Sequence, residues 1–278
     1  MNAKTILSSL AAALLLSTTP ALAQSSKLQE VLARGHLILG TGSTNAPWHF
    51  KSETDQLQGF DVDMGRIVAK ALFGDPDKIE YVTQASDARI PNITTNKVDM
   101  TCQFMTVTGE RAQQVAFTIP YYREGVGLMM RADGAYADFE ALKAAGSAVT
   151  VSVLQNVYAE DMVHAALPEA TVDQYDAQDL IYQALDAGRA DAAATDQSSI
   201  AWFMTQNAGR YRDAGYGWNP QSYSCAVAQG DQTWLNFVNT ALHEAMTGVE
   251  FQFYADSFKT WFGTELAPPK IGFPVEFQ

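Results

Sequence analysis

Segments of strand length alternate with segments of helix length through the first hundred residues of this 278-residue chain, and few folds accommodate that alternation. Residues 36–42, 79–85 and 98–104 have the apolar or alternating patterns of strands. Residues 59–74 repeat apolar side chains at spacings of three and four, and residues 86–96 have the start signals of a short helix. Strands that alternate with helices form parallel sheets with helices packed on them. The sequence therefore predicts an α/β fold with a doubly wound parallel sheet.

The same alternation returns between residues 147 and 196, which predicts a second sheet covered by helices. Extended segments at 125–133 and 223–229 flank this second region, and helices near Trp234–Met246 and Phe251–Phe262 follow it. The pattern predicts one lobe inserted into another and joined to it by two extended segments. We expect a ligand to bind in the cleft at the carboxyl ends of the strands.

The amino terminus has the composition of a secretory signal peptide. Lys4 provides a positive start, an apolar run extends from Ile6 to Leu16, and Ala21 to Ala23 form a small-residue cleavage pattern. The apolar run is too short to span a bilayer comfortably, and no later segment approaches about 18 unbroken apolar residues. We therefore expect cleavage after Ala23 and a soluble protein exported to the periplasm.

About 255 residues follow the predicted signal peptide of residues 1–23, which is enough for one large domain or for two lobes with separate cores. The alternation favours two lobes. We predict a discontinuous first lobe of residues 24–126 and 226–278, and a second lobe of residues 127–225.

The chain is acidic, with 18 basic and 31 acidic residues and a formal net charge of −13 at pH 7. This balance excludes a nucleic-acid binder that acts through general electrostatic attraction, and it suits a soluble exported protein. The possible metal ligands are too few or too scattered for a metal site: two cysteines, and histidines at positions 36, 49, 164 and 243. We expect neither a metal nor a cofactor.

The strongest functional pattern lies between Asp99 and Tyr122. Here a buried strand is followed by a threonine-rich turn and the first turn of a helix, which places Thr106 and Thr108 at the strand end and Arg111 in the helix. An arginine beside hydroxyls and free backbone N–H groups offers the planar set of donors that a carboxylate requires. The segment therefore predicts a carboxylate site.

This pattern, T-x-T-x-x-R followed by F-T-I-P-Y-Y, resembles the bacterial family 3 extracellular solute-binding proteins, which are periplasmic receptors of polar amino acid ABC transporters. The resemblance covers nearly the whole mature chain and implies a type II periplasmic binding protein fold, with two doubly wound lobes joined by two hinge strands. The glutamate/aspartate-binding branch of the family is the most similar in appearance. The segments that carry the resemblance are GFDVDMGRIVAKAL, RIPNITTNKVDMTC, TVTGERAQQVAFTIPYY, LDAGRADAAATD, SYSCAV and KTWFGTELAPPK.

The resemblance assigns the two ends of an amino acid ligand to different lobes. It implies that Arg111, with the hydroxyl and backbone N–H of Thr106, binds the α-carboxylate. It implies that Asp196, at the end of LDAGRADAAATD, binds the ammonium group. Alternatively, Arg111 could be an ordinary surface residue of its helix, and Asp196 could cap the helix that begins at Gln197. The capping role and the binding role of Asp196 are compatible.

The side-chain pocket departs from the acidic branch of the family. Gly42 and Gln178 stand where that branch has an arginine and a histidine, whereas Arg89 matches its other arginine and has Ser86 three residues before it. Both a neutral polar ligand side chain and an acidic one held by Arg89 remain open. The resemblance places further residues around the ligand, although the aromatic ones could equally belong to the core; these residues are Asn45, Trp48, Phe104, Tyr158 and Gln178.

The same resemblance brings Cys102 and Cys225 onto neighbouring strands of the first lobe, so we predict a disulfide between them. The alternative is two buried thiols that pack as small apolar side chains.

The predicted function is binding without chemistry. An amino acid would close the lobes around itself, and a membrane permease with cytoplasmic ATPases would recognise the closed form of a monomeric receptor. One alternative is an enzyme on the same fold, similar to cyclohexadienyl dehydratases, for which Glu110 and Glu124 are the nearest acidic candidates without an evident acid–base pair. Another is a binding protein for a ligand that is not an amino acid.

Overall fold

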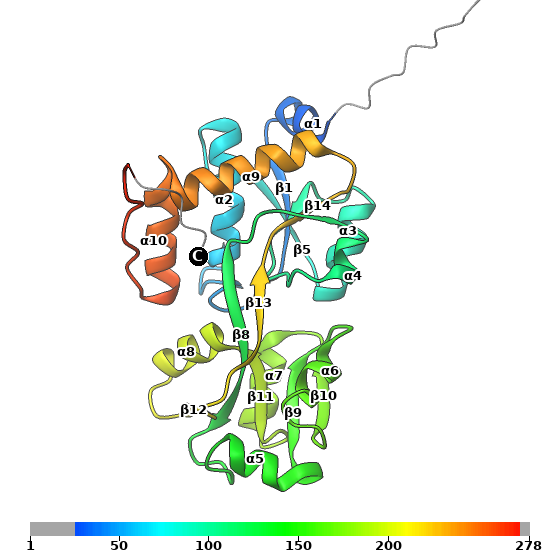
Figure 1. The fold of residues 1–278 in the computed structure, drawn as a ribbon, viewed down its shortest axis with the longest axis vertical. Helices are drawn as coiled ribbons and strands as arrows, with labels where there is room; N and C mark the ends of the chain where they lie inside the picture. Colours follow the sequence, from blue (N-terminus) through cyan, green and yellow to red (C-terminus); the bar gives the residue numbers. More distant parts are fainter. Residues whose placement is uncertain (1–25, 273–278) are drawn as a thin grey trace, which may run out of the picture.

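The computed structural model describes residues 26–272, and the predicted signal peptide lies outside them. Two sheet-containing lobes lie one above the other along the longest axis of the molecule (Figure 1). This arrangement confirms the predicted α/β fold with two lobes. Between residues 26 and 272, no helix combines the length and the apolar character that crossing a membrane requires.

The first lobe is built on a five-stranded sheet with strand order β5-β1-β6-β14-β7. The first three strands are parallel, as the alternation predicts, and the last two are antiparallel to their neighbours. The strands are β1 (Leu37–Thr41), β5 (Ile79–Thr83), β6 (Met100–Thr101), β7 (Ala116–Phe117) and β14 (Ala226–Val227).

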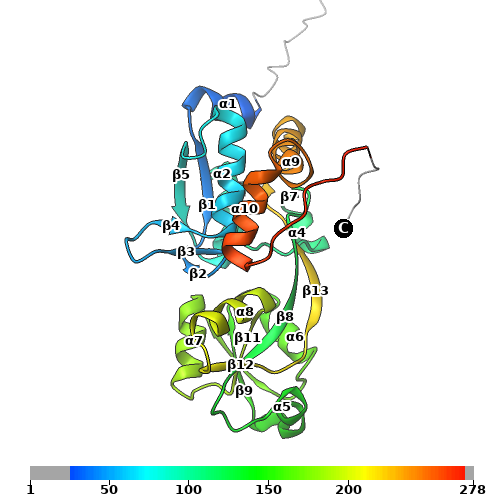
Figure 2. The ribbon, with the colours of Figure 1, turned by 90° about the vertical axis from the view of Figure 1, so that its left-hand side faces the viewer.

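Helices cover both faces of this sheet. Apolar side chains from four helices pack into one core on one face: α1 (Lys27–Arg34), α2 (Phe60–Phe73), α9 (Gln232–Thr247) and α10 (Phe251–Phe262). A smaller core on the other face includes side chains of α3 (Arg89–Thr94), and the short α4 (Gly109–Ala112) follows later in the chain. The last two long helices thus complete a core that begins near the start of the chain (Figure 2).

The second lobe contains the sheet β10-β9-β11-β8-β12, in which the first three strands are parallel. One face packs against α5 (Phe139–Ala145) and α6 (Ala159–His164), and the other against α7 (Gln178–Asp186) and α8 (Gln197–Gln206). The strands are β8 (Tyr122–Arg131), β9 (Thr150–Leu154), β10 (Thr171–Tyr175), β11 (Ala192–Asp196) and β12 (Tyr211–Asp213).

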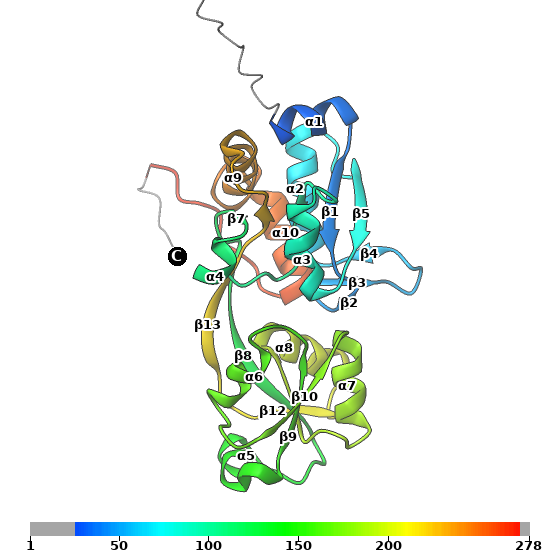
Figure 3. The ribbon, with the colours of Figure 1, turned by 90° about the vertical axis from the view of Figure 1, so that its right-hand side faces the viewer.

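Two antiparallel strands connect the lobes, β8 and β13 (Trp218–Tyr223) (Figure 3). The prediction that residues 223–229 form the second connection was wrong. The crossing ends at Tyr223, and the apolar residues after it already belong to the first lobe through β14. The true crossing strand is polar and contains Pro220, which is tolerated because β13 pairs with β8 alone.

A three-stranded sheet between residues 44 and 58 was not predicted. Its strands are only two or three residues long, too short to give a periodic pattern: β2 (Thr44–Asn45), β3 (His49–Lys51) and β4 (Leu57–Gln58).

The predicted disulfide is confirmed. Cys102 follows β6 and Cys225 precedes β14, and both side chains are fully buried, with a Cα–Cα distance of 4.4 Å. The bond links parts of the first lobe that are 123 residues apart in sequence.

Candidate functional site

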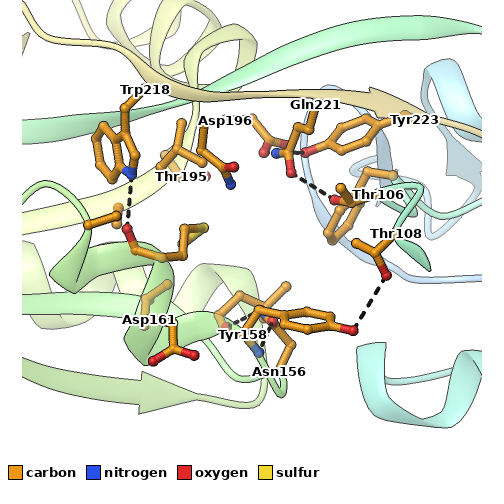
Figure 4. Close-up of a pocket in the computed structure, with 18 of the residues that line it drawn as sticks. Thr106, Thr108, Asn156, Tyr158, Asp161, Thr195, Asp196, Trp218, Gln221 and Tyr223 are labelled. Atoms are coloured by element: carbon orange, nitrogen blue, oxygen red, sulfur yellow. Dashed lines mark hydrogen bonds between the residues drawn. The ribbon is translucent and has the colours of Figure 1, made fainter. Parts of the chain in front are cut away.

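A cleft of about 590 Å³ lies between the lobes, with walls from both of them (Figure 4). It opens where β11 ends and where the connecting strands leave the second lobe. Eight of the predicted ligand-binding residues line it: Asn45, Arg89, Phe104, Thr106, Arg111, Tyr158, Gln178 and Asp196.

Arg111 is held in the first-lobe wall of the cleft by the turn that precedes it. Its backbone N–H donates to the Thr108 hydroxyl, the N-cap of α4, at 3.2 Å. Its Nη1 donates to the Thr106 carbonyl at 3.0 Å, and the guanidinium lies 5.0 Å from the centre of the Tyr158 ring. Burial lowers the pKa of Arg111, yet an arginine remains cationic at neutral pH. The turn therefore presents a fixed positive charge to the cleft.

Asp196 lies in the second-lobe wall, at the end of β11. Its Oδ1 accepts a hydrogen bond of 2.5 Å from the Tyr223 hydroxyl, whereas its buried Oδ2 has no hydrogen-bond partner among the described residues. The side chain makes no cap hydrogen bond to α8, so the capping alternative is not realised. Burial, followed by repulsion from Glu124, raises the pKa of Asp196 well above the usual aspartate value. A buried carboxylate with one unpartnered oxygen is strongly stabilised by a cation that binds that oxygen.

Arg89 contributes a second buried cation beside the cleft. Its Nε donates to the Ser86 carbonyl at 2.6 Å and its Nη1 to the Gln103 carbonyl at 2.9 Å, while the guanidinium lies 5.5 Å from the centre of the Phe104 ring. Burial and the nearby charge of Arg111 lower its pKa to about 9. Within residues 26–272, neither arginine forms an ion pair, so both charges are available to an anionic or polar ligand.

Amide groups complete a polar corner of the cleft. Gln178 Nε2 donates to the Tyr182 hydroxyl and to Thr195 Oγ1, both at 2.8 Å, which fixes the amide orientation. The buried Asn45 Oδ1 has no partner in the described part of the chain. This corner therefore offers an acceptor that a ligand N–H could satisfy.

Trp48 and Ser86 are not among the residues that line the cleft. Trp48 is fully buried in the first-lobe core, where its ring centre lies 4.8 Å from that of Tyr122 and 5.2 Å from that of Tyr223. Its Nε1 donates to the Ser198 hydroxyl of the second lobe at 3.1 Å. Ser86 meets the site only through its carbonyl, which accepts from Arg89. Both residues thus support neighbours that line the cleft.

Several residues that line the cleft were missing from the predicted set. Four of them come from β13 and were missed because the crossing strand was placed too late in the sequence: Trp218, Asn219, Gln221 and Tyr223. Thr108 belongs to the same threonine pattern as Thr106, which was a usable signal. The rest of the second lobe adds further residues that the predicted set omitted: Val126, Val153, Leu154, Asn156, Asp161, Met162, Ala165, Ala194 and Thr195.

The lobes also touch beside the cleft. The Tyr158 hydroxyl of the second lobe donates to Glu110 Oε2 of the first at 2.7 Å, and the backbone N–H of Gln178 donates to Thr44 Oγ1 at 3.4 Å. Together with the bond between Trp48 and Ser198, these contacts show the lobes in a closed arrangement.

The acidic side chains considered for proton transfer do not line the cleft. Glu110 is exposed and bonded to Tyr158. Glu124 is buried, and it accepts from the Ser198 hydroxyl at 2.5 Å and from the Gly125 backbone N–H at 2.8 Å. Between residues 26 and 272, no group of three or more histidine, cysteine, aspartate or glutamate side chains could hold a metal ion.

Comparison with known proteins gives a family match across most of the chain. Residues 37–264 match the family described as bacterial extracellular solute-binding proteins, family 3. The glutamine-binding protein of Geobacillus stearothermophilus is 28% identical over 76% of this chain and 80% of its own length. The histidine-binding periplasmic protein of Salmonella typhimurium is 30% identical over 62% of this chain and 65% of its own length.

A solved structure shares the fold. It is the crystal structure of an ancestral amino acid-binding protein, AncCDT-1, described as a precursor of cyclohexadienyl dehydratase. It aligns with a TM-score of 0.74 and 30% identity over 86% of this chain and all of that one.

Proposed function

This chain belongs to the bacterial extracellular solute-binding proteins, family 3, and we propose that it binds a polar amino acid in the periplasm and delivers it to an ABC transporter permease. One observation carries this proposal. A buried arginine that forms no ion pair within residues 26–272 lines the cleft from one lobe, and a buried aspartate with an oxygen left open by those residues lines it from the other. An amino acid zwitterion has the complementary pair of charges.

The proposed mechanism follows from the position of these two charges. The ligand carboxylate binds Arg111. The Thr106 hydroxyl, which donates to Gln221 Oε1 at 2.8 Å, turns to donate to the carboxylate instead, and the ligand ammonium then satisfies Oδ2 of Asp196. Because the ligand contacts both lobes only when they are closed, it stabilises the closed form relative to the open one. The closed monomer is what a permease would recognise. Micromolar affinity corresponds to a binding free energy of about −8 kcal/mol.

The polar corner favours a neutral amide as the ligand side chain. Among the described residues, Asn45 Oδ1 has no donor, and Arg89 donates to carbonyl groups but to no carboxylate. A carboxamide can donate to the former and accept from the latter, while a carboxylate can only accept. Relatives named for glutamine and histidine support a neutral or weakly basic polar side chain, and glutamine is the first ligand to test.

The test is a titration of refolded, ligand-free mature protein with each of the twenty amino acids by isothermal titration calorimetry. We expect saturable binding of glutamine or another polar amino acid. Arg111→Ala and Asp196→Asn should each weaken that binding about 100-fold, the loss of roughly 3 kcal/mol expected for a buried charge-assisted contact. The proposal is overturned if none of the twenty amino acids binds. It is also overturned if the protein turns over prephenate, which would identify an enzyme.

A further inference from the structure

The cleft extends beyond the charged and polar groups that an amino acid requires. Its volume of about 590 Å³ compares with roughly 300 Å³ at most for glutamine, if each of its about ten non-hydrogen atoms is given the volume of a water molecule in the liquid. Part of the cleft reaches into the second lobe beside α6, where Trp218 and Asp161 are among the residues that line it (Figure 4).

The strand register places this space next to Asp196. Asp196 on β11 lies opposite Val126 on β8, and Val126 lies opposite Trp218 on β13, so these three side chains share one face of the sheet. Ala194 lies two residues before Asp196 on that face, opposite Val153 on β9. The Asp196 carboxylate thus lies at the edge of an apolar part of this sheet face, which we call the floor of the space.

Helix α6 covers this floor and Trp218 closes its side. Met162 and Ala165 line the cleft from α6, and the Trp218 indole N–H donates to the Met162 carbonyl at 2.9 Å. That bond satisfies the indole, so the ring presents its carbon surface to the space. We name this space the α6 hollow, defined by Val126, Val153, Met162, Ala165, Ala194 and Trp218.

The polar corner lies on the opposite face of the same strand. Thr195, the residue between Ala194 and Asp196, bonds Gln178 there. A ligand whose ammonium sits on Asp196 therefore has a polar region on one side of that ammonium and an apolar region on the other. A primary amino acid has one side chain, which the polar corner takes, and it leaves the α6 hollow unfilled.

We propose that the α6 hollow binds an apolar substituent on the ligand's amino group, so that N-alkylated polar amino acids are ligands of this protein. This inference rests on the proposed function, because it needs the ammonium on Asp196. A secondary ammonium keeps its positive charge and two N–H groups, so alkylation preserves the donor to Oδ2. The six residues that define the hollow carry no charge, which favours an apolar substituent, and Asp161, which lines the cleft beside them, would repel an anionic one.

The experiment compares glutamine, N-methylglutamine and N-isobutylglutamine by calorimetry on the refolded, ligand-free mature protein. N-isobutylglutamine should bind at least tenfold more tightly than glutamine. If glutamine binds and N-isobutylglutamine binds equally or more weakly, this inference fails while the proposed function stands. If neither these compounds nor any of the twenty amino acids bind, both fail.

A substitution that fills the hollow gives an independent test. Ala165 is exposed at the end of α6, so Ala165→Leu can extend into the hollow without entering the core. It should reduce the ratio of N-isobutylglutamine to glutamine affinity about tenfold. Ala144→Leu, the same change on an exposed position of α5, is the matched control and should leave the ratio unchanged. An unchanged ratio in Ala165→Leu would place the substituent elsewhere and overturn the inference.

Discussion

At the scale of single residues, the cleft concentrates charged groups that have been removed from water. Asp196 keeps one oxygen bonded to Tyr223 and the other open. Burial, and then the charge of Asp196, raises the pKa of the Tyr223 hydroxyl, so Tyr223 remains a donor. Glu124 is a second buried carboxyl group whose pKa burial raises. Keeping these buried carboxylates ionised is therefore unfavourable in free energy, and a bound ammonium group offsets that penalty.

This arrangement predicts that ligand affinity falls as the pH is lowered through the pKa of Asp196. Because that pKa is raised above the ordinary aspartate value of 3.8, the loss should begin at a higher pH than for an exposed aspartate. Arg111 and Arg89 stay protonated over this range and do not contribute. Calorimetry from about pH 8 to about pH 5 measures the effect, with proton release on binding as a second readout.

The matched variant for this prediction is Asp196→Asn, which should bind weakly at every pH. A residual pH dependence of the same size in the variant would assign the effect to another group, with Glu124 the nearest candidate.

At the scale of elements, aromatic side chains from three elements meet across the gap between the lobes. The Trp202 ring on α8 lies 6.1 Å from Phe50 on β3 and 6.2 Å from Trp261 on α10, measured between ring centres. Trp261 is anchored through its indole N–H, which donates to Asp63 Oδ2 at 2.7 Å. None of the three rings lines the cleft. These contacts exist only when the lobes are close, so they favour the closed form.

We therefore expect Trp202→Ala to weaken ligand binding about fivefold, although the side chain touches no ligand. The magnitude follows from about 1 kcal/mol for an aromatic pair, at 1.4 kcal/mol for each tenfold change. Calorimetry measures the affinity, and small-angle scattering should show a more open average form. Trp202→Phe keeps an aromatic ring and should lose less; equal losses in both variants would exclude aromatic packing as the cause.

The disulfide supports a second prediction at this scale. It closes a loop of 123 residues between β6 and β14, and such a link restricts the unfolded chain. Replacing both Cys102 and Cys225 by serine should lower the free energy of unfolding by about 2–4 kcal/mol in a urea titration. Neither cysteine lines the cleft, so the folded variant should keep its ligand affinity within a few-fold. An affinity loss of 100-fold would show that the bond positions the site.

At the scale of the whole molecule, the sequence predicts those helices and strands whose apolar side chains recur with a regular period. The strands and helices around Leu39, Met64 and Val151 carry clear periodic patterns, so the two lobes were predictable. The crossing strand was not, because Trp218–Tyr223 is polar and contains a proline. Trp48 shows the limit at the site, since an aromatic residue in this pattern can face the ligand or the core, and only packing decides. The α6 hollow likewise depends on strand register, which no single segment encodes.

The discontinuity of the first lobe has a consequence for the order in which the molecule is assembled. The second lobe is one continuous stretch, and all the strands of its sheet are present once the chain has emerged as far as Tyr223. The first lobe must wait for β14, α9 and α10, because these elements supply a middle strand and much of a core whose other members emerged about two hundred residues earlier. A chain that leaves its point of synthesis amino terminus first thus completes its inserted half before its enclosing half, and it exposes the unfinished apolar face of the first sheet throughout that interval.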